Sequence, residues 1–232
     1  MADAGLAPDP WQAELLRSHA TRMLLLCSRQ AGKSQTAAAL ALRAALLRPS
    51  SLVLLLSPTQ RQSGELFRDK VLRLYDDLGR PVRSTQQTAL TLSLANDSRI
   101  ISLPGNSGGI RGYSGVSLLV IDEASQVPDD LYCSVRPMLA VSGGSLVALS
   151  TPFGKRGWFF EEWSGNNEWE RVKITADRCP RITKEFLAEE RASLGDRYFR
   201  QEYLCSFEDT VDAVFAHEDI QAAMSDEVRP LF

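Results

Sequence analysis

The sequence predicts an α/β domain with a mainly parallel sheet flanked by helices, and two observations support that prediction. Short apolar runs recur along the chain, and three of them are separated by segments with helical patterning. The runs are continuous rather than alternating, which is typical of strands buried on both faces, as in a parallel sheet covered by helices. The expected core strands are residues 23–27, 52–56, 118–121 and 146–149.

The composition is that of a globular protein. The 232 residues are 44% apolar and 24% charged, which excludes intrinsic disorder, collagen and coiled coil. No apolar run approaches the roughly 18 residues needed to cross a bilayer. Residues 2–10 carry two aspartates and no basic residue, which does not fit a signal peptide. We therefore expect a soluble, cytosolic protein without membrane contact.

The charge and the cysteines limit the function classes further. A net charge of −3 argues against a genome-coating protein, so any contact with nucleic acid has to come from a local basic patch. The four cysteines are scattered without a Cys-x-x-Cys pair, which argues against a disulfide framework and a zinc site. We expect buried free thiols at Cys27, Cys133, Cys179 and Cys205.

Two further regions complete the expected sheet. Alternating runs at 89–95 and 99–103 flank Asn-Asp-Ser at 96–98, which predicts an antiparallel hairpin at an edge of the sheet. The segment 104–115 then has five glycines in twelve residues. Such a segment is either a mobile surface loop or a loop shaped by a ligand or a partner.

The chain is expected to divide into a core at 1–180 and a small helical subdomain at 181–232. Residues 184–194 and 196–205 have the pattern of two amphipathic helices, expected to pack on the sheet. The segment from 181 onward holds 6 basic and 12 acidic side chains, so its exposed faces are acidic.

A phosphate-binding loop is predicted at 27–34. The segment follows an apolar strand and opens an Ala/Leu-rich helix at 34–47, the context that a P-loop requires. Lys33 would reach the β and γ phosphates and Ser34 would ligate Mg²⁺. Cys27 stands where the usual pattern has its first glycine, and an ordinary strand-to-helix turn is the alternative. The expected nucleotide-binding residues are Ser28, Arg29, Gln30, Ala31, Gly32, Lys33, Ser34 and Gln35.

Arg29 is unusual within such a loop. Its guanidinium could lie against the γ-phosphate and stabilise its charge from within the same subunit. The alternative is a solvated turn residue. Gln30 is expected to shape the loop rather than to take part in chemistry.

Two carboxylates end the strand at 118–121. Ligands bind at the carboxyl ends of strands in open α/β sheets. Asp122 would hold Mg²⁺ through water, and Glu123 would act as the general base for an attacking water. A glutamate directly after the aspartate points to ATP hydrolysis by water rather than transfer to another substrate. Alone, the two acids could also be surface turn residues.

Two weaker signals lie at other strand ends. Ser150 and Thr151 close the strand at 146–149 and could couple the state of the γ-phosphate to movement, although turn chemistry before a proline is an equal alternative. Trp11 and Gln12 precede the first core strand. Gln12 could read the adenine edge while Trp11 packs nearby, or it could be a chance surface residue.

In this order the motifs resemble the large terminase subunit of tailed bacteriophages, the motor that pumps double-stranded DNA into the procapsid. The resemblance covers nearly the whole chain, and its most specific feature is the P-loop that lacks its first glycine and contains an arginine. The matching segments are Trp11-Gln12, 28–34, Ser57-Pro58-Thr59, 110–113, 121–124, Ser150-Thr151-Pro152 and 199–204.

The resemblance implies an ASCE-type P-loop ATPase that uses ATP and Mg²⁺, with Lys33, Arg29, Asp122 and Glu123 in the roles given above. It also implies that Arg111 acts on a neighbouring subunit's nucleotide, although an arginine in a glycine-rich loop could instead bind DNA phosphate or be solvated. The implied partners are double-stranded DNA, the portal protein and the small terminase subunit. The protein would form a homo-oligomeric ring at the procapsid in the host cytoplasm and be a monomer in isolation.

The end of the chain departs from that pattern. Terminases of this family carry a second, RNase H-like nuclease domain, and the chain stops where that domain should begin. We therefore expect an isolated ATPase domain, truncated or separately encoded, without nuclease activity. The late acids are expected to form a solvated face rather than a nuclease site: Asp209, Asp212, Glu218 and Asp219.

Two competing functions remain open. A superfamily 2 helicase or related translocase shares the glutamine, P-loop and Asp-Glu elements, but it needs a second RecA-like domain for which there is no room after residue 180. A catalytically silent nucleotide-binding scaffold is the other alternative. Phosphate release from ATP separates the scaffold from the motor.

Overall fold

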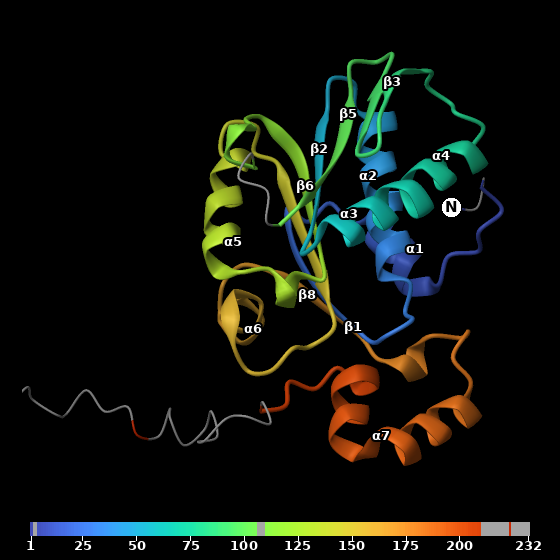
Figure 1. Ribbon diagram of the computed structural model, residues 1–232, viewed down its shortest axis with the longest axis vertical. Helices are drawn as coiled ribbons and strands as arrows, with labels where there is room; N and C mark the ends of the chain where they lie inside the picture. Colours follow the sequence, from blue (N-terminus) through green and yellow to red (C-terminus); the bar gives the residue numbers. More distant parts are fainter. Residues whose placement is uncertain (2–3, 106–109, 210–222, 224–232) are drawn as a thin grey trace, which may run out of the picture.

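The computed structural model describes residues 1, 4–105, 110–209 and 223, with the backbone alone at Arg111. In this part of the chain one sheet has the strand order β3-β4-β5-β2-β6-β7-β1-β8 (Figure 1). From β5 to β8 all neighbours are parallel, and β3 and β4 are antiparallel additions. The strands are β1 (Arg22–Cys27), β2 (Leu52–Ser57), β3 (Ser84–Gln87), β4 (Thr91–Leu94), β5 (Arg99–Pro104), β6 (Val116–Asp122), β7 (Ser145–Ser150) and β8 (Glu170–Ile174).

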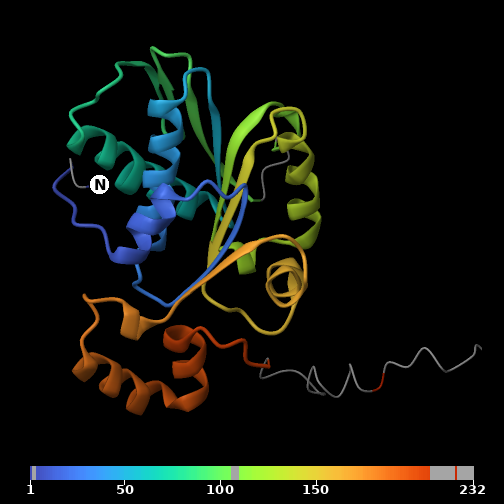
Figure 2. The ribbon, with the colours of Figure 1, turned by 180° about the vertical axis from the view of Figure 1, so that it is seen from behind.

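Helices cover both faces of the sheet. Helices α1 to α4 lie on one face, and α5 and α6 lie on the other, as the views from both sides show (Figures 1 and 2). The helices are α1 (Pro10–Arg17), α2 (Lys33–Leu47), α3 (Gln60–Leu66), the π-helix η2 (Phe67–Leu72), α4 (Arg73–Asp77), α5 (Asp129–Val135), α6 (Gly157–Ser164) and α7 (Lys184–Leu204). Short 3-10 turns are η3 (Ile110–Gly112), η4 (Ala124–Gln126), η5 (Arg136–Leu139) and η6 (Ala176–Arg178).

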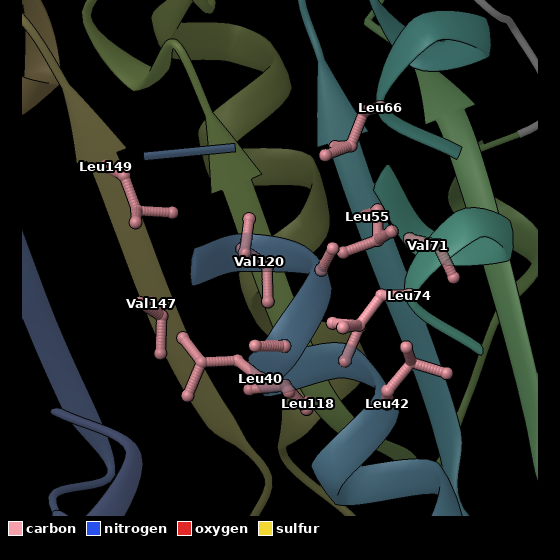
Figure 3. Close-up of a cluster of buried hydrophobic side chains, with 14 of the residues drawn as sticks. Leu40, Leu42, Leu55, Leu66, Val71, Leu74, Leu118, Val120, Val147 and Leu149 are labelled. Atoms are coloured by element: carbon pink, nitrogen blue, oxygen red, sulfur yellow. The ribbon is translucent and has the colours of Figure 1, made fainter. Parts of the chain in front are cut away.

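The core has two layers, one on each face of the sheet. Successive residues of a strand point to opposite faces, so Leu55 and Val120 pack in the layer under α2 to α4 (Figure 3). Their neighbours Leu54 and Leu119 pack in the layer with α5 and α6. Burying each such side chain contributes about 1.5–3 kcal/mol. Both layers fix the strand ends, and thereby the loops that follow them.

The four predicted core strands and the α/β class are confirmed. The antiparallel hairpin is confirmed as β4 and β5, but its expected place at the edge of the sheet is wrong, because β3 pairs with β4 outside it. Neither β3 nor β8 is among the predicted strands. The β3 sequence, Ser-Thr-Gln-Gln, is polar and largely exposed, so no hydrophobic pattern marks it.

The two predicted C-terminal helices form α7, which breaks at Gly195. Contrary to expectation, α7 does not cover a face of the sheet: it lies beyond the carboxyl ends of the strands, beside the phosphate loop (Figures 1 and 2). The backbone N–H of Arg29 donates to the carbonyl of Glu202 at 2.9 Å, and Phe199 and Tyr203 pack with Ala176 of η6. The division at residue 180 stays a prediction.

Gly195 adopts φ 77° and ψ 161°, a conformation essentially confined to glycine. A Cβ there meets no atom within 4 Å, so an added methyl group costs backbone strain rather than a clash. We expect Gly195→Ala to lower the free energy of unfolding by about 1–3 kcal/mol. Urea denaturation measures this change in the free energy of unfolding. The matched control is Gly64→Ala within α3, where the Cβ space is also open and where stability should rise by about 0.5–1 kcal/mol. Equal effects would contradict the backbone argument.

The four cysteines are free, as expected, but Cys133 is exposed, because it lies on the solvent side of α5. Within the described ranges, no three His, Cys, Asp or Glu side chains are grouped to hold a metal. None of the helices in the described part combines the length and apolar character of a bilayer-spanning segment. Of the late acids, Asp209 pairs with Lys155, and Asp212, Glu218 and Asp219 lie outside the described residues.

Candidate nucleotide site

The predicted motifs meet at the carboxyl edge of the sheet. The phosphate loop follows β1, Asp122 and Glu123 end β6, and Thr151 follows β7; β6, β7 and β1 are adjacent parallel strands, so their carboxyl ends lie together. A cavity of about 480 Å³ opens there. It is lined by Arg29, Gln30, Gly32, Lys33, Ser34, Gln35, Gln62, Lys70, Glu123, Gln126 and Thr151.

The phosphate loop has the backbone of an anion cradle. Gln30 and Gly32 have φ values of 58° and 94°, and α2 begins directly after them, which directs its free N–H groups toward the cavity. The φ of Gly32 strains any residue with a side chain, and a Cβ there would lie 2.9 Å from Nε2 of Gln12, so the position favours glycine. Cys27 is fully buried, and burial raises the pKa of its thiol, so it packs as a neutral side chain.

Lys33 and Ser34 lie at the floor of the cavity. The Lys33 side chain is buried, with Nζ 3.4 Å from the carbonyl oxygen of Ser28 and 3.8 Å from Oε1 of Glu123. Ser34 Oγ donates to Oδ2 of Asp122 at 3.0 Å. The two predicted metal ligands are therefore neighbours.

Asp122 is buried, and this burial, reinforced by the charge of Glu123, raises its pKa to about 6. Lys33 and the Ser34 hydroxyl act in the opposite direction. A hydroxyl and a carboxylate side by side are hard oxygen donors, and Mg²⁺ is usually held by one or two such groups together with phosphate and water. The residues present therefore fit Mg²⁺, whose charge would offset the cost of burying an ionised Asp122.

Glu123 has a left-handed backbone, with φ 50° and ψ 46°. This conformation costs a non-glycine residue roughly 1–2 kcal/mol and is frequent at functional sites. It turns the chain away from the strand direction directly after Asp122, and the Glu123 side chain lines the cavity. The carboxylate is partly exposed, so water can reach it.

Arg29 is held by α7. Its guanidinium forms an ion pair with the Glu202 carboxylate, and this hydrogen bond and charge raise the pKa of Arg29. The side chain is 65% exposed and also lines the cavity. The ion pair engages Nε, so the terminal nitrogens of the guanidinium keep their donors for the predicted contact with the γ-phosphate. Glu202 belongs to the segment 199–204 that the resemblance singles out, but the sequence does not indicate its partner.

Trp11 and Gln12 do not line the cavity; both are buried. Gln12 Nε2 donates to Oγ1 of Thr36 in α2 at 3.0 Å, and its Oε1 accepts from the N–H of Asp9. Gln12 thereby braces α1 against the helix of the phosphate loop. Its predicted contact with adenine stays a prediction.

Arg181 is a residue that the sequence analysis missed. It donates to Oδ1 of Asp9 at 2.6 Å and to the carbonyl of Ala31 at 3.1 Å, so it supports the phosphate loop from outside. It lies 150 residues from Ala31, and no local pattern marks it. Gln62, Lys70 and Gln126 also line the cavity without having been predicted.

Ser150 contacts the loop after Glu123. Its buried hydroxyl lies 2.7 Å from Oγ of Ser125, which also donates to the carbonyl of Thr151 at 2.9 Å. These hydrogen bonds link the ends of β6 and β7. The predicted coupling of the γ-phosphate state to movement would require such a link. Arg111 lies in η3, and its side chain falls outside the described residues.

Comparison with solved structures shows a shared fold. The ATPase domain of the large terminase of Thermus phage P74-26 superposes with a TM-score of 0.76 at 24% identity, over 89% of this chain and 96% of that one. The bacteriophage HK97 large terminase gives a TM-score of 0.68 at 16% identity, over 88% of this chain and 51% of that one. A further large terminase, from a thermophilic bacteriophage, is known in complexes with ADP and with ATP-gamma-S.

Sequence comparison shows the family. The terminase large subunits of Thermus phage G20c and Thermus virus P23-45 are each 26% identical to this chain, over 93% of this chain and 52% of the relative. The chain thus spans about half the length of these two relatives. The family described as terminase large subunit, T4likevirus-type, N-terminal, matches residues 24–222. Because this match extends over most of the chain, the chain belongs to the T4likevirus-type terminase large subunit family, in its N-terminal part.

Proposed function

We propose that this chain is the ATP-hydrolysing motor domain of a viral large terminase, which drives double-stranded DNA into the procapsid. The observation that carries the proposal is the meeting of Lys33, Ser34 and Glu123 at one cavity, with Asp122 hydrogen-bonded to Ser34 beside it. Family membership supports the motor role. Residues after β1 and at the end of β6 would supply phosphate binding, metal binding and a general base within one subunit.

In the proposed reaction a water molecule attacks the γ-phosphorus of ATP. The bond from that phosphorus to the bridging oxygen breaks, ADP and inorganic phosphate leave, and Glu123 accepts the proton of the attacking water. Lys33 and the backbone N–H groups of the loop hold the phosphate oxygens. Ser34 and Asp122 would hold Mg²⁺, which supplies further positive charge.

Other predicted roles belong to the same proposal. Arg29 would stabilise the γ-phosphate from its own subunit and Arg111 from a neighbour's, while Thr151 and Ser150 would couple the nucleotide state to movement. Trp11 and Gln12 would contact the adenine. The proposed partners are the portal protein, the small terminase subunit and DNA, in a homo-oligomeric ring in the host cytoplasm. No nuclease activity is expected of this chain.

The test is phosphate release from ATP at high protein concentration, with and without DNA. We expect release to require Mg²⁺ and to be lost in Lys33→Ala, whereas Lys184→Ala, an exposed position on α7, should behave as wild type. Nucleotide binding without any release at any concentration would favour a silent scaffold instead.

A further inference from the structure

The cavity holds three cationic side chains: Arg29, Lys33 and Lys70. Arg29 is paired with Glu202, and Lys33 lies 3.8 Å from Glu123. Lys70 is half-buried and has no ion pair within the part of the chain that the structure describes. Among these described residues, it is thus the one cation of the cavity without a carboxylate oxygen within 4.0 Å of its ammonium nitrogen.

Lys70 lies on the wall opposite the phosphate loop. That wall is the helical segment after β2, and it also lines an adjoining cavity of about 260 Å³. Ser34, Asp122 and Glu123 line the adjoining cavity together with Lys70, so Lys70 faces the side of the site that carries the metal ligands and the general base.

The carboxylates of the same wall are already paired. Glu65 accepts from Arg61 at 2.7 Å, and Asp69 accepts from Arg68 at 2.7 Å. Both arginines are mostly exposed, whereas Glu65 and Asp69 also line the adjoining cavity. Because each of these carboxylates forms its ion pair with an arginine, the ammonium of Lys70 keeps its hydrogen-bond donors for an anion in the cavity.

The π-helix η2 explains how Lys70 reaches the site. In a continuous α-helix, Lys70 would be rotated by about 80° from Gln62, eight residues earlier, which also lines both cavities. A π turn advances less per residue, which reduces this offset and brings the two side chains toward one face. Phe67 and Val71 anchor the turn in the core, and Val71 packs near Leu55 (Figure 3). Such π turns are frequent at functional sites.

We propose that Lys70 is a further phosphate-binding residue, which contacts the terminal phosphate of a nucleoside triphosphate from the wall opposite the phosphate loop. The inference rests on the proposed ATPase function. A lysine ammonium is a compact charge with three donors, suited to phosphate oxygens. Because a diphosphate lacks the terminal group, Lys70 would favour ATP over ADP.

The experiment is calorimetric titration of ADP and of ATP-gamma-S, with Mg²⁺, into wild type and Lys70→Gln. We expect the affinity for ATP-gamma-S to fall about ten- to a hundredfold, the effect of one charge-assisted hydrogen bond, with the affinity for ADP within about twofold of wild type. Lys70→Arg, which keeps the positive charge, should restore most of the affinity for ATP-gamma-S. The matched control is Arg73→Gln, an exposed position on the same helical segment that lines neither cavity.

The outcomes separate the two proposals. Loss of nucleotide binding in Lys33→Ala would show that wild type binds both nucleotides through Lys33. In that case, if Lys70→Gln weakens the binding of both nucleotides equally, or of neither, the proposed role of Lys70 is wrong while the ATPase proposal stands. If wild type binds neither nucleotide, the proposed ATPase function fails and the role of Lys70 fails with it. Thermal unfolding of each variant shows whether the fold is kept.

Discussion

Replacing Glu123 by glutamine is expected to reduce ATP turnover by about 10² to 10⁴, the range of general-base catalysis, while nucleotide binding is retained. Glutamine keeps the size of the side chain but cannot accept the water proton. The positive charge of Lys33, 3.8 Å away in wild type, remains available to the phosphates. Single-turnover phosphate release measures the chemical step, and titration with ATP-gamma-S measures binding.

The control for that variant is Glu161→Gln, the same chemical change at an exposed position of α6. It should leave turnover unchanged. If Glu123→Gln hydrolyses ATP at the wild-type rate, another group activates the water. A loss of binding equal to the loss of turnover would instead make Glu123 a structural residue of the loop.

Arg111→Ala is expected to have a still larger effect, because an arginine supplied by a neighbouring subunit changes phosphoryl-transfer rates by about 10³ to 10⁵. Arg111 lies in η3, within the glycine-rich segment 104–115 that leads into β6. If Arg111 of one subunit completes the ATP site of its neighbour, the specific activity of the wild-type domain should rise with protein concentration. The control is Arg83→Ala, at an exposed position just before β3.

Mixing two inactive variants tests the arrangement directly. A ring of Arg111→Ala and Glu123→Gln subunits contains interfaces where an intact Glu123 meets a neighbour's intact Arg111, so some activity should return. Sedimentation confirms that both variants assemble. No rescue at any ratio by assembling variants would place Arg111 in its own subunit's site or outside catalysis.

The sequence predicted the fold wherever hydrophobic patterning is strong. The run Leu52 to Leu56 indicated a strand buried on both faces, because it is short and no residue in it is polar. The phosphate loop was predictable because its chemistry is local: Gly32, Lys33 and Ser34 act within one turn of chain that joins β1 to α2. The break of α7 was predictable because the helical pattern stops on both sides of Gly195.

The polar edge of the sheet was decided by tertiary structure. β3 is held by backbone hydrogen bonding to β4 rather than by burial of its side chains, so its residues carry no pattern. The hairpin was recognisable, whereas its place next to β3 depended on a strand that composition does not reveal.

Tertiary structure also determined which residues from distant segments of the chain join the site. Glu202 meets Arg29 across 173 residues of sequence, and Arg181 meets Ala31 across 150. Lys70 enters the cavity because η2 alters the rotation of its helix. Hydrophobic patterning specifies which faces are buried, and local motifs specify which loops bind phosphate. The partner that a charged side chain meets depends on how distant segments are placed, which only the packed core determines.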